Sequence, residues 1–104
     1  MKILMDNFEI LLIHEIEDVT NDNIDIVVTY EEQEYTATVF TLNNIKTLME
    51  RFEQTGESGK GLYFSCYDML IVKDLKKSTI INTISNIINE GKIGLVLKKI
   101  SRHE

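Results

Sequence analysis

The chain has 104 residues, of which 43% are hydrophobic and 27% are charged, proportions typical of one globular domain and not of a disordered or fibrous chain. The net charge is −6 and only two of the eleven basic residues are arginine, which argues against nucleic acid as a partner because phosphate binding requires clustered Lys and Arg. Cys66 is the only cysteine, so an intrachain disulfide is excluded. Asp6 interrupts the apolar amino terminus too early for a secretory signal or a membrane span. We therefore expect a cytoplasmic protein with no membrane contact.

Alternating apolar and polar residues dominate the first 40 positions. Residues 8–17 are predicted to form the first strand, although their pattern fits a helix about equally well. Residues 24–30 and 35–40 alternate more regularly, and we expect them to form a hairpin. A four-residue loop would place Tyr30 opposite Tyr35, so that the two apolar sets share one face of the sheet.

Two later segments have helical spacing. The first follows Thr41, a residue suited to cap a helix, and ends at Gly56. Its apolar stripe consists of Ile45, Leu48, Met49 and Phe52. The second segment carries isoleucines between positions 80 and 88 and ends at Gly91, and its start is open between a cap at Asp74 and one at Ser78. Because Thr and Ser lower its intrinsic helix propensity, we expect this helix to depend on packing against a sheet.

The remaining apolar segments complete the predicted fold. Residues 62–66 and 69–73 are expected to form a second hairpin, and residues 93–100 a closing strand. Together the elements predict a single α+β domain over residues 1–104, with the order βββαββαβ. We expect a mostly antiparallel sheet with two helices packed on one face.

Charge is spread unevenly along the chain. Residues 1–38 hold ten carboxylates and one cation, a charge of −9, whereas residues 39–104 hold ten cations and seven carboxylates, a charge of +3. An acidic region of this kind would attract a basic partner and would bind it more weakly in salt. A solvated surface is the alternative interpretation, because charge runs usually mark a wetted side. The acidic candidates for partner binding are Glu15, Glu17, Asp18, Asp22, Asp25, Glu31, Glu32 and Glu34.

The sheet face away from the helices is the expected centre of such an interface. If the helices cover the side that holds Ile26, then Val27 and Phe40 point the other way and are candidate apolar anchors among threonines. Leu11 and Ile13 of the first strand would join them. An apolar centre with a polar rim is typical of protein interfaces. A second layer over this face, or a homodimer through it, would produce the same pattern.

The sequence specifies no catalytic, cofactor or metal-binding motif. Residues 56–61 are rich in glycine and contain a lysine, but they lack the spacing of a phosphate loop and follow a helix instead of preceding one. Cys66 would need a nearby base to act as a nucleophile, and His14 and His103 are the only histidines. Residues 18–25 lack the glycine and the final glutamate of a calcium loop. We expect a protein that is not an enzyme and holds no cofactor or metal.

These features favour a non-catalytic protein-binding module that uses its acidic sheet region against a basic protein. Small size, acidity and cytoplasmic character are similar to those of bacterial immunity proteins and antitoxins, a likeness of class without a shared motif, which implies a toxin-neutralising role. One alternative is a structural or regulatory homo-oligomer that pairs the threonine-rich face with itself. Another is a small-ligand-binding domain with a pocket between sheet and helices, near Tyr63, Cys66 and Tyr67.

Overall fold

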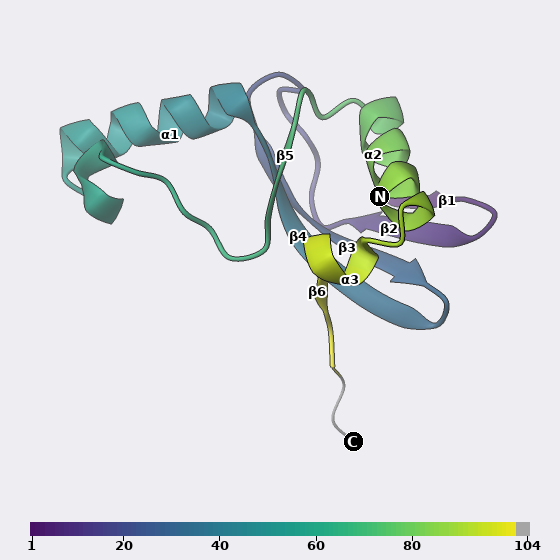
Figure 1. Cartoon of the computed structure of the whole chain (residues 1–104). Coiled ribbons are helices and arrows are strands. Elements are labelled where there is room, and N and C mark those ends of the chain that lie inside the picture. The colour runs from purple at the N-terminus through teal and green to yellow at the C-terminus, as the bar shows by residue number, and fades with distance from the viewer. Residues whose placement is uncertain (102–104) are drawn as a thin grey trace.

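The strands of the sheet follow the alternation of apolar and polar residues. In the computed structural model, which describes residues 1–101, β1 (Lys2–Leu4), β2 (Phe8–Leu12), β3 (Asn23–Tyr30) and β4 (Gln33–Thr41) pair in chain order as an antiparallel meander (Figure 1). Strand β5 (Met69–Val72) is parallel to the second half of β4, and β6 (Lys98–Lys99) is antiparallel to its first half. The predicted α+β class and the mostly antiparallel sheet are confirmed.

The core lies between the sheet and α2 (Lys77–Asn89). Ile10, Ile24 and Ile26 are fully buried on the sheet side, because they occupy the same face of neighbouring strands. The helix covers them with four isoleucines: Ile80, Ile84, Ile87 and Ile88. Its N-terminal residue follows a turn in which Asp74 Oδ1 accepts the amide of Lys76 at 3.0 Å. These contacts are the sheet packing on which we expect the helix to depend.

The amino-terminal prediction needs two corrections. Residues 8–17 are not one strand, because β2 ends at Leu12 and a loop follows as far as Asp22. A further strand, β1, precedes β2 and pairs with it. The β3–β4 turn is also tighter than expected, since Tyr30 lies opposite Gln33 and not Tyr35. The shift is two residues, so the apolar residues of both strands still share one face.

The predicted hairpin at residues 62–66 and 69–73 is wrong. Residues 62–66 form no strand, and β5 pairs with β4 in a parallel direction instead. The predicted strand at 93–100 is also wrong over its first half, where α3 (Ile93–Val96) forms a single helical turn. Ile93 and Leu97 are both buried while Leu95 is 86% exposed. That four-residue spacing of buried side chains belongs to a helix, whereas a strand would have placed all three on one side.

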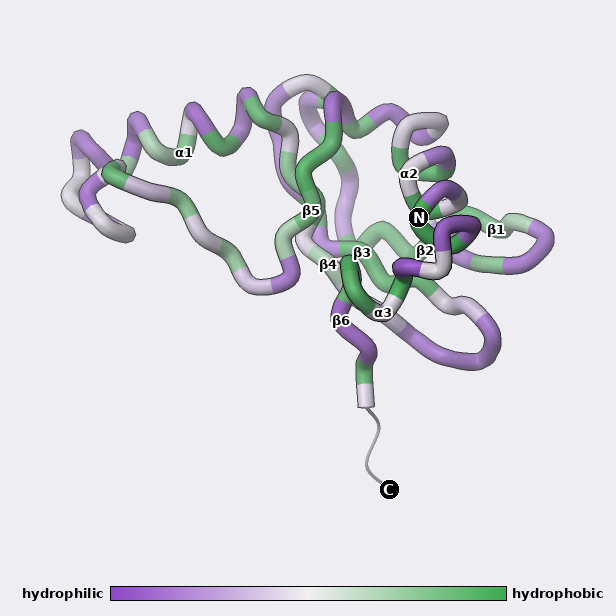
Figure 2. The backbone as a smooth tube through the Cα atoms, in the orientation of Figure 1, coloured by the Kyte–Doolittle hydropathy of each residue, from purple (hydrophilic) through white to green (hydrophobic). Residues whose placement is uncertain are grey.

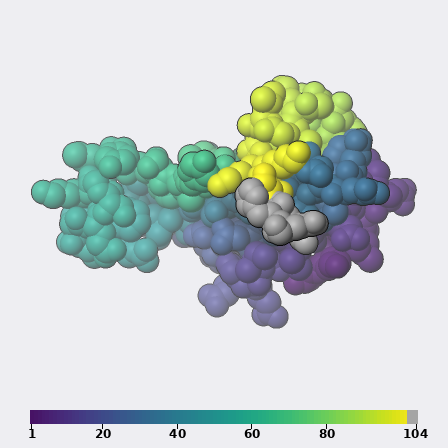
Figure 3. Space-filling view, turned by 90° about the horizontal axis from the view of Figure 1, so that it is seen from below, coloured from purple at the N-terminus to yellow at the C-terminus, as the bar shows by residue number. Residues whose placement is uncertain are grey.

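The helix α1 (Leu42–Thr55) extends away from the sheet at the end of β4 (Figure 1). Thr41 Oγ1 accepts the amide of Asn44 at 3.1 Å and caps the helix, and Gly56 ends it with a φ of 80°, as predicted for both positions. The 3-10 turn η1 (Ser58–Gly61) and residues 62–66 return along the helix. We refer to residues 42–66 as the arm; it projects from the body of the molecule in Figure 3.

The arm makes the molecule elongated. The principal extents are 44 × 31 × 24 Å and the radius of gyration is 14.6 Å, compared with about 13 Å for a compact chain of 100 residues. The two helices thus contribute unequally to the core. All the buried helical side chains of the main cluster come from α2 and α3, whereas the stripe of α1 is half-buried against its own returning segment.

Candidate functional site

The face of the sheet opposite α2 is the strongest candidate for a functional surface. Its central row runs across five strands through Lys2, Leu11, Val27, Thr36 and Lys98, which are paired in register. Leu11 is 38% exposed, and Val27 and Thr36 are half-buried. We call this surface the open face. Its other members are Leu4, Glu9, Asp25, Thr29, Glu34, Thr38, Met69 and Ile71.

Apolar and polar side chains are mixed on the open face, even within one row of the sheet. Ile71, at the β5 edge, is 45% exposed, and Met69 beside it is half-buried. Thr38 Oγ1 donates to Asp25 Oδ1 at 2.6 Å, and Thr36 Oγ1 donates to the carbonyl of Ile26 at 2.9 Å. Both hydroxyls therefore have hydrogen-bond partners within the protein.

Phe40 is a correction to the predicted site. It lies in line with the open face, but it is only 4% exposed because Phe64 of the arm packs on it edge to face, with ring centroids 5.0 Å apart. The predicted anchor is therefore a structural contact that fixes the base of the arm. Val27, the other predicted anchor, does lie near the centre of the open face.

The structure separates the predicted acidic residues into two groups. Glu31 and Glu32 form the β3–β4 turn, where both have positive φ, and Glu34 follows at the start of β4. The remaining loop acids lie at the opposite end of the same hairpin, about 25 Å away for a strand of this length. That second group consists of Glu15, Glu17, Asp18 and Asp22. Asp25 lies between the groups on the open face. The acids therefore flank the apolar centre and do not form one cluster.

Two of the loop acids, Asp18 and Asp22, accept hydrogen bonds from backbone amides of their own loop. Asp18 Oδ1 accepts both the amide of Thr20, at 2.9 Å, and its hydroxyl, at 2.8 Å. These bonds lower the pKa of Asp18, with the backbone amide as the larger cause. Asp22 accepts the amides of Glu17 and Asn23 at 3.1 and 2.8 Å. The carboxylates that are exposed and outside these turns, such as Glu15, are better placed to meet a partner.

A ladder of amide side chains connects the β2–β3 loop to the arm. Asn23 Nδ2 donates to Asn44 Oδ1 at 2.8 Å, Asn44 Nδ2 donates to Asn21 Oδ1 at 3.3 Å, and Asn21 Nδ2 donates to Thr47 Oγ1 at 3.1 Å. Asn44 is buried, and the ladder gives both its Oδ1 and its Nδ2 a hydrogen-bond partner. The sequence reasoning missed this network, because nothing in the spacing of these asparagines relates positions more than twenty residues apart.

A cavity of about 440 Å³ lies where the arm meets the sheet. Its walls are largely apolar and aromatic, and they include Phe40, Phe52, Tyr63 and Cys66. Tyr67, which was expected beside it, points elsewhere: the Lys98 ammonium lies 4.6 Å from the centre of its ring. The cavity lies close to the position predicted for a small-ligand pocket.

Chemically reactive groups are dispersed. Cys66 Sγ donates to the carbonyl of its neighbour Tyr67 at 3.5 Å, and His14 Nδ1 lies 3.2 Å from the carbonyl of Glu15. Within residues 1–101, no three side chains of His, Cys, Asp or Glu are grouped so that they could hold a metal ion. His103 lies outside the described residues. Among the helices of residues 1–101, none has the length and apolar character that crossing a membrane requires.

Comparison with known proteins adds no functional assignment. No known protein family matches the chain, and neither a curated protein nor a solved structure matches it. The functional interpretation therefore depends on the surfaces described above.

Proposed function

We propose that the chain is a non-catalytic, cytoplasmic module that binds a basic protein through the open face of its sheet. The observation that carries the proposal is the combination on one surface of exposed apolar side chains, with Leu11 and Val27 near the centre, and carboxylates at both ends of the β3–β4 hairpin. The cytoplasmic location is supported by the single cysteine, since small exported domains usually carry disulfides.

The distribution of charge supports a basic partner. The open face itself is nearly balanced in charge, because Lys2 and Lys98 offset two of its three carboxylates. The excess of acid lies at the two ends of the hairpin, within the first 38 residues, whose formal charge is −9. Acids placed around an apolar centre accelerate encounter with a positive surface and favour one orientation, while the apolar contacts supply most of the affinity. The two acidic ends would contact two basic patches that lie about 25 Å apart on the partner. A bacterial toxin neutralised by this chain would be such a partner.

The test separates the apolar centre from the acidic ends. Val27→Arg places a charge near the centre of the open face, and we expect it to abolish capture of the partner in a tagged pull-down. A second variant reverses four exposed acids, Glu15, Glu17, Glu31 and Glu32, to lysine. We expect it to weaken capture at about 50 mM salt and to have little further effect at about 500 mM, where exposed charges are strongly screened.

The matched control is Glu50→Lys with Glu53→Lys, which reverses two exposed acids on α1 and leaves the open face unchanged. Capture should survive in this control at both salt concentrations. If Val27→Arg and the control capture the same proteins equally well, the open face is not the binding surface. Sedimentation of the purified chain decides the homo-oligomer alternative, because self-pairing through the open face predicts a dimer that Val27→Arg dissociates.

The cavity at the base of the arm favours one second candidate, the binding of a small apolar ligand. Its volume of about 440 Å³ and its aromatic lining are within the range of ligand sites. A screen of small aromatic compounds by thermal denaturation tests this function, because binding to the native state raises the melting temperature. Phe52→Ala enlarges the cavity and removes part of its lining, so a specific ligand should lose its effect in that variant.

A further inference from the structure

Strand β5 leaves one edge of the sheet unpaired. Both β5 and β6 pair with β4, and they share its outer edge end to end. The four residues of β5 carry no charge, and the whole chain contains no proline. Figure 2 shows β5 as a continuous hydrophobic segment. Natural proteins usually protect such an edge with charged residues or proline, so an uncharged exposed strand is a candidate for pairing with another chain.

The hydrogen-bonding direction of each β5 residue can be derived from its register. Thr38 donates its amide to the carbonyl of Asp68 at 3.0 Å, and Thr38 is paired with Met69. Because backbone groups alternate along a parallel strand, Leu70 and Val72 point their amides and carbonyls toward β4. Those of Met69 and Ile71 therefore point outward. Within residues 1–101, no hydrogen bond reaches the outward amide or carbonyl of Ile71.

A groove of about 790 Å³ lies beside this free edge, between β5 and α2. Leu70, Val72 and Val96 contribute apolar lining, and polar side chains of α2 such as Asn82 and Thr83 line the opposite wall. A strand edge with a helix beside it offers an extended peptide two kinds of contact. The peptide backbone completes the sheet, and alternate side chains enter the groove.

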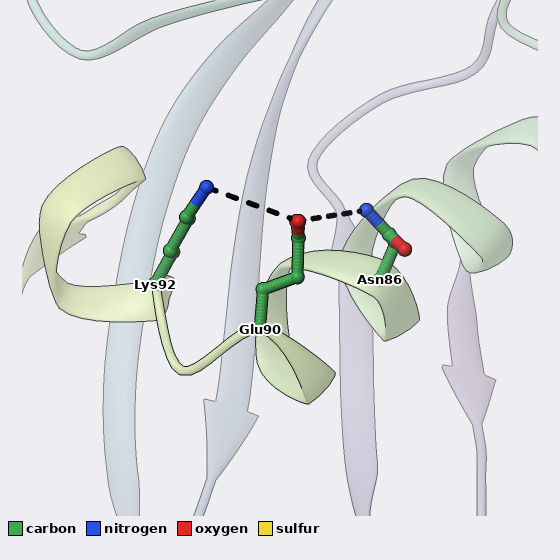
Figure 4. A network of polar contacts seen from close by, with 3 residues as sticks. All are labelled: Asn86, Glu90 and Lys92. Carbon is green, nitrogen blue, oxygen red and sulfur yellow. Dashed lines mark hydrogen bonds and ion pairs between the residues drawn. The ribbon is translucent and has the colours of Figure 1, made fainter.

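Four lysines lie in or next to the groove, against the two carboxylates of Asp74 and Glu90. Lys73 lies at one end of the lining and Lys92 at the other, and Lys76 and Lys77 precede the lining residue Ser78. At the far end, Lys92 Nζ is 3.8 Å from Glu90 Oε1, and Asn86 Nδ2 donates to Glu90 Oε2 at 3.2 Å (Figure 4). Glu90 offsets the charge of Lys92, so the excess of lysine at the other end would favour a peptide with acidic residues over a basic one.

We infer that the β5–α2 groove binds an extended, acidic segment of another protein as an added strand. This site uses the backbone edge of β5 and the groove beside it, and it adjoins the open face at Met69 and Ile71. Its occupant has the opposite charge to the partner proposed for the open face. The inference does not depend on the proposed function, because backbone pairing at β5 needs none of the open-face acids.

The probe is a library of random eight-residue peptides displayed on phage, selected against the purified full chain. We expect selected sequences rich in Asp or Glu and in β-branched residues, which favour extended structure. A fluorescein-labelled consensus peptide then gives a dissociation constant by fluorescence polarisation. Ile71→Pro removes the outward amide without touching a bond to β4, and proline is tolerated on an edge strand when its nitrogen faces outward. We expect it to weaken peptide binding about tenfold or more, because it leaves a peptide carbonyl unpaired.

Four further variants separate the explanations. Ile71→Thr changes the same side chain but keeps the amide, so its binding should remain close to that of the original chain. Leu4→Pro is the matched control on the other free edge, β1, and should bind normally. Lys73→Glu with Lys92→Glu should weaken binding severalfold, whereas Lys46→Glu with Lys60→Glu on the arm should not. Thermal denaturation of each variant checks that it folds.

Several outcomes would overturn the inference. They are the absence of any enriched peptide, the selection of basic peptides, and equal binding by Ile71→Pro and Ile71→Thr. A dimer in sedimentation that Ile71→Pro dissociates would assign the edge to a second copy of this chain instead. The Val27→Arg variant distinguishes this site from the open face, because it should abolish partner capture there and leave peptide binding unchanged.

Discussion

Truncation of Ile84 to alanine tests how much of the fold depends on α2. The side chain is 1% exposed and lies in the isoleucine stripe that covers the sheet. Removing a fully buried isoleucine in this way costs about 2–5 kcal/mol, which includes the lost transfer free energy and the cavity left behind. Alanine is the better helix former by about 0.4 kcal/mol, so part of the loss is recovered. We therefore expect a net loss of about 3 kcal/mol in the free energy of unfolding.

The matched variant is Leu48→Ala on α1. Leu48 belongs to the apolar stripe of that helix, but it is only half-buried, and α1 contributes no side chain to the main core cluster. Its truncation leaves an open surface in place of an enclosed cavity, and we expect a cost of about 1 kcal/mol. Both helices have a clear hydrophobic stripe in the sequence, so the comparison isolates tertiary burial from helical pattern.

Urea denaturation followed by circular dichroism measures both free energies. With a denaturant dependence of about 1–3 kcal/mol per molar for a chain of this size, the Ile84→Ala midpoint should fall by roughly 1–3 M. The Leu48→Ala midpoint should fall by about a third as much. Equal losses in the two variants would refute the reasoning, because they would place α1 in the same cooperative core as α2.

Further predictions concern the arm and the turn before α2. Thr41→Ala removes the N-cap of α1 and should lower the free energy of unfolding by about 1 kcal/mol, measured in urea; no loss would mean that the cap is replaced. Gly61→Ala should destabilise the arm, because a Cβ at position 61 would lie 2.6 Å from the carbonyl oxygen of Met49 and because Gly61 has a φ of +78°. Faster proteolysis within the arm measures this effect, and unchanged cleavage would contradict the close contact. Hydrogen bonds from Thr79 and from the amide of Lys76 lower the pKa of Asp74 below its ordinary 3.8. The stabilisation by this carboxylate is therefore present above about pH 4 and is lost as the pH falls through the lower, folded-state pKa. Asp74→Asn should lower the melting temperature at pH 7, and the difference from the original chain should shrink as the pH is lowered below 3.8. An effect that does not change with pH would exclude the charge as the cause.

The alternation of residues 24–40 and the helical spacing of the isoleucines in α2 were sufficient to predict the α+β class and the buried face of the sheet. These patterns are local, since each reports which side of one element meets the core. Helix caps are local as well, which explains why Thr41 and Gly56 were identified correctly. The residues of the open face could be predicted in the same way. Successive side chains of a strand point to opposite faces, so identifying the buried residues also identifies the residues on the other face.

The binding surfaces were only partly predictable. Val27 was placed correctly on the open face, but Phe40 occupies the same side of the sheet and is buried. The difference comes from Phe64, a residue 24 positions further along the chain, and no pattern in either segment predicts their contact. The free edge of β5 was missed for a related reason. The predicted hairpin would have paired that strand with residues 62–66, but those residues form no strand and belong to the arm.

The sequence by itself therefore determined the type of the main elements, the side that each presents to the core, and the excess of acid in the first 38 residues. Tertiary structure alone decided the parallel pairing of β5, the separation of the acids to two ends of a hairpin, and the projection of α1 away from the core. These features depend on contacts between segments far apart in the chain. The packing of the whole domain selects such contacts. A local pattern indicates whether a side chain is buried or exposed, but it does not indicate which distant residue that side chain contacts.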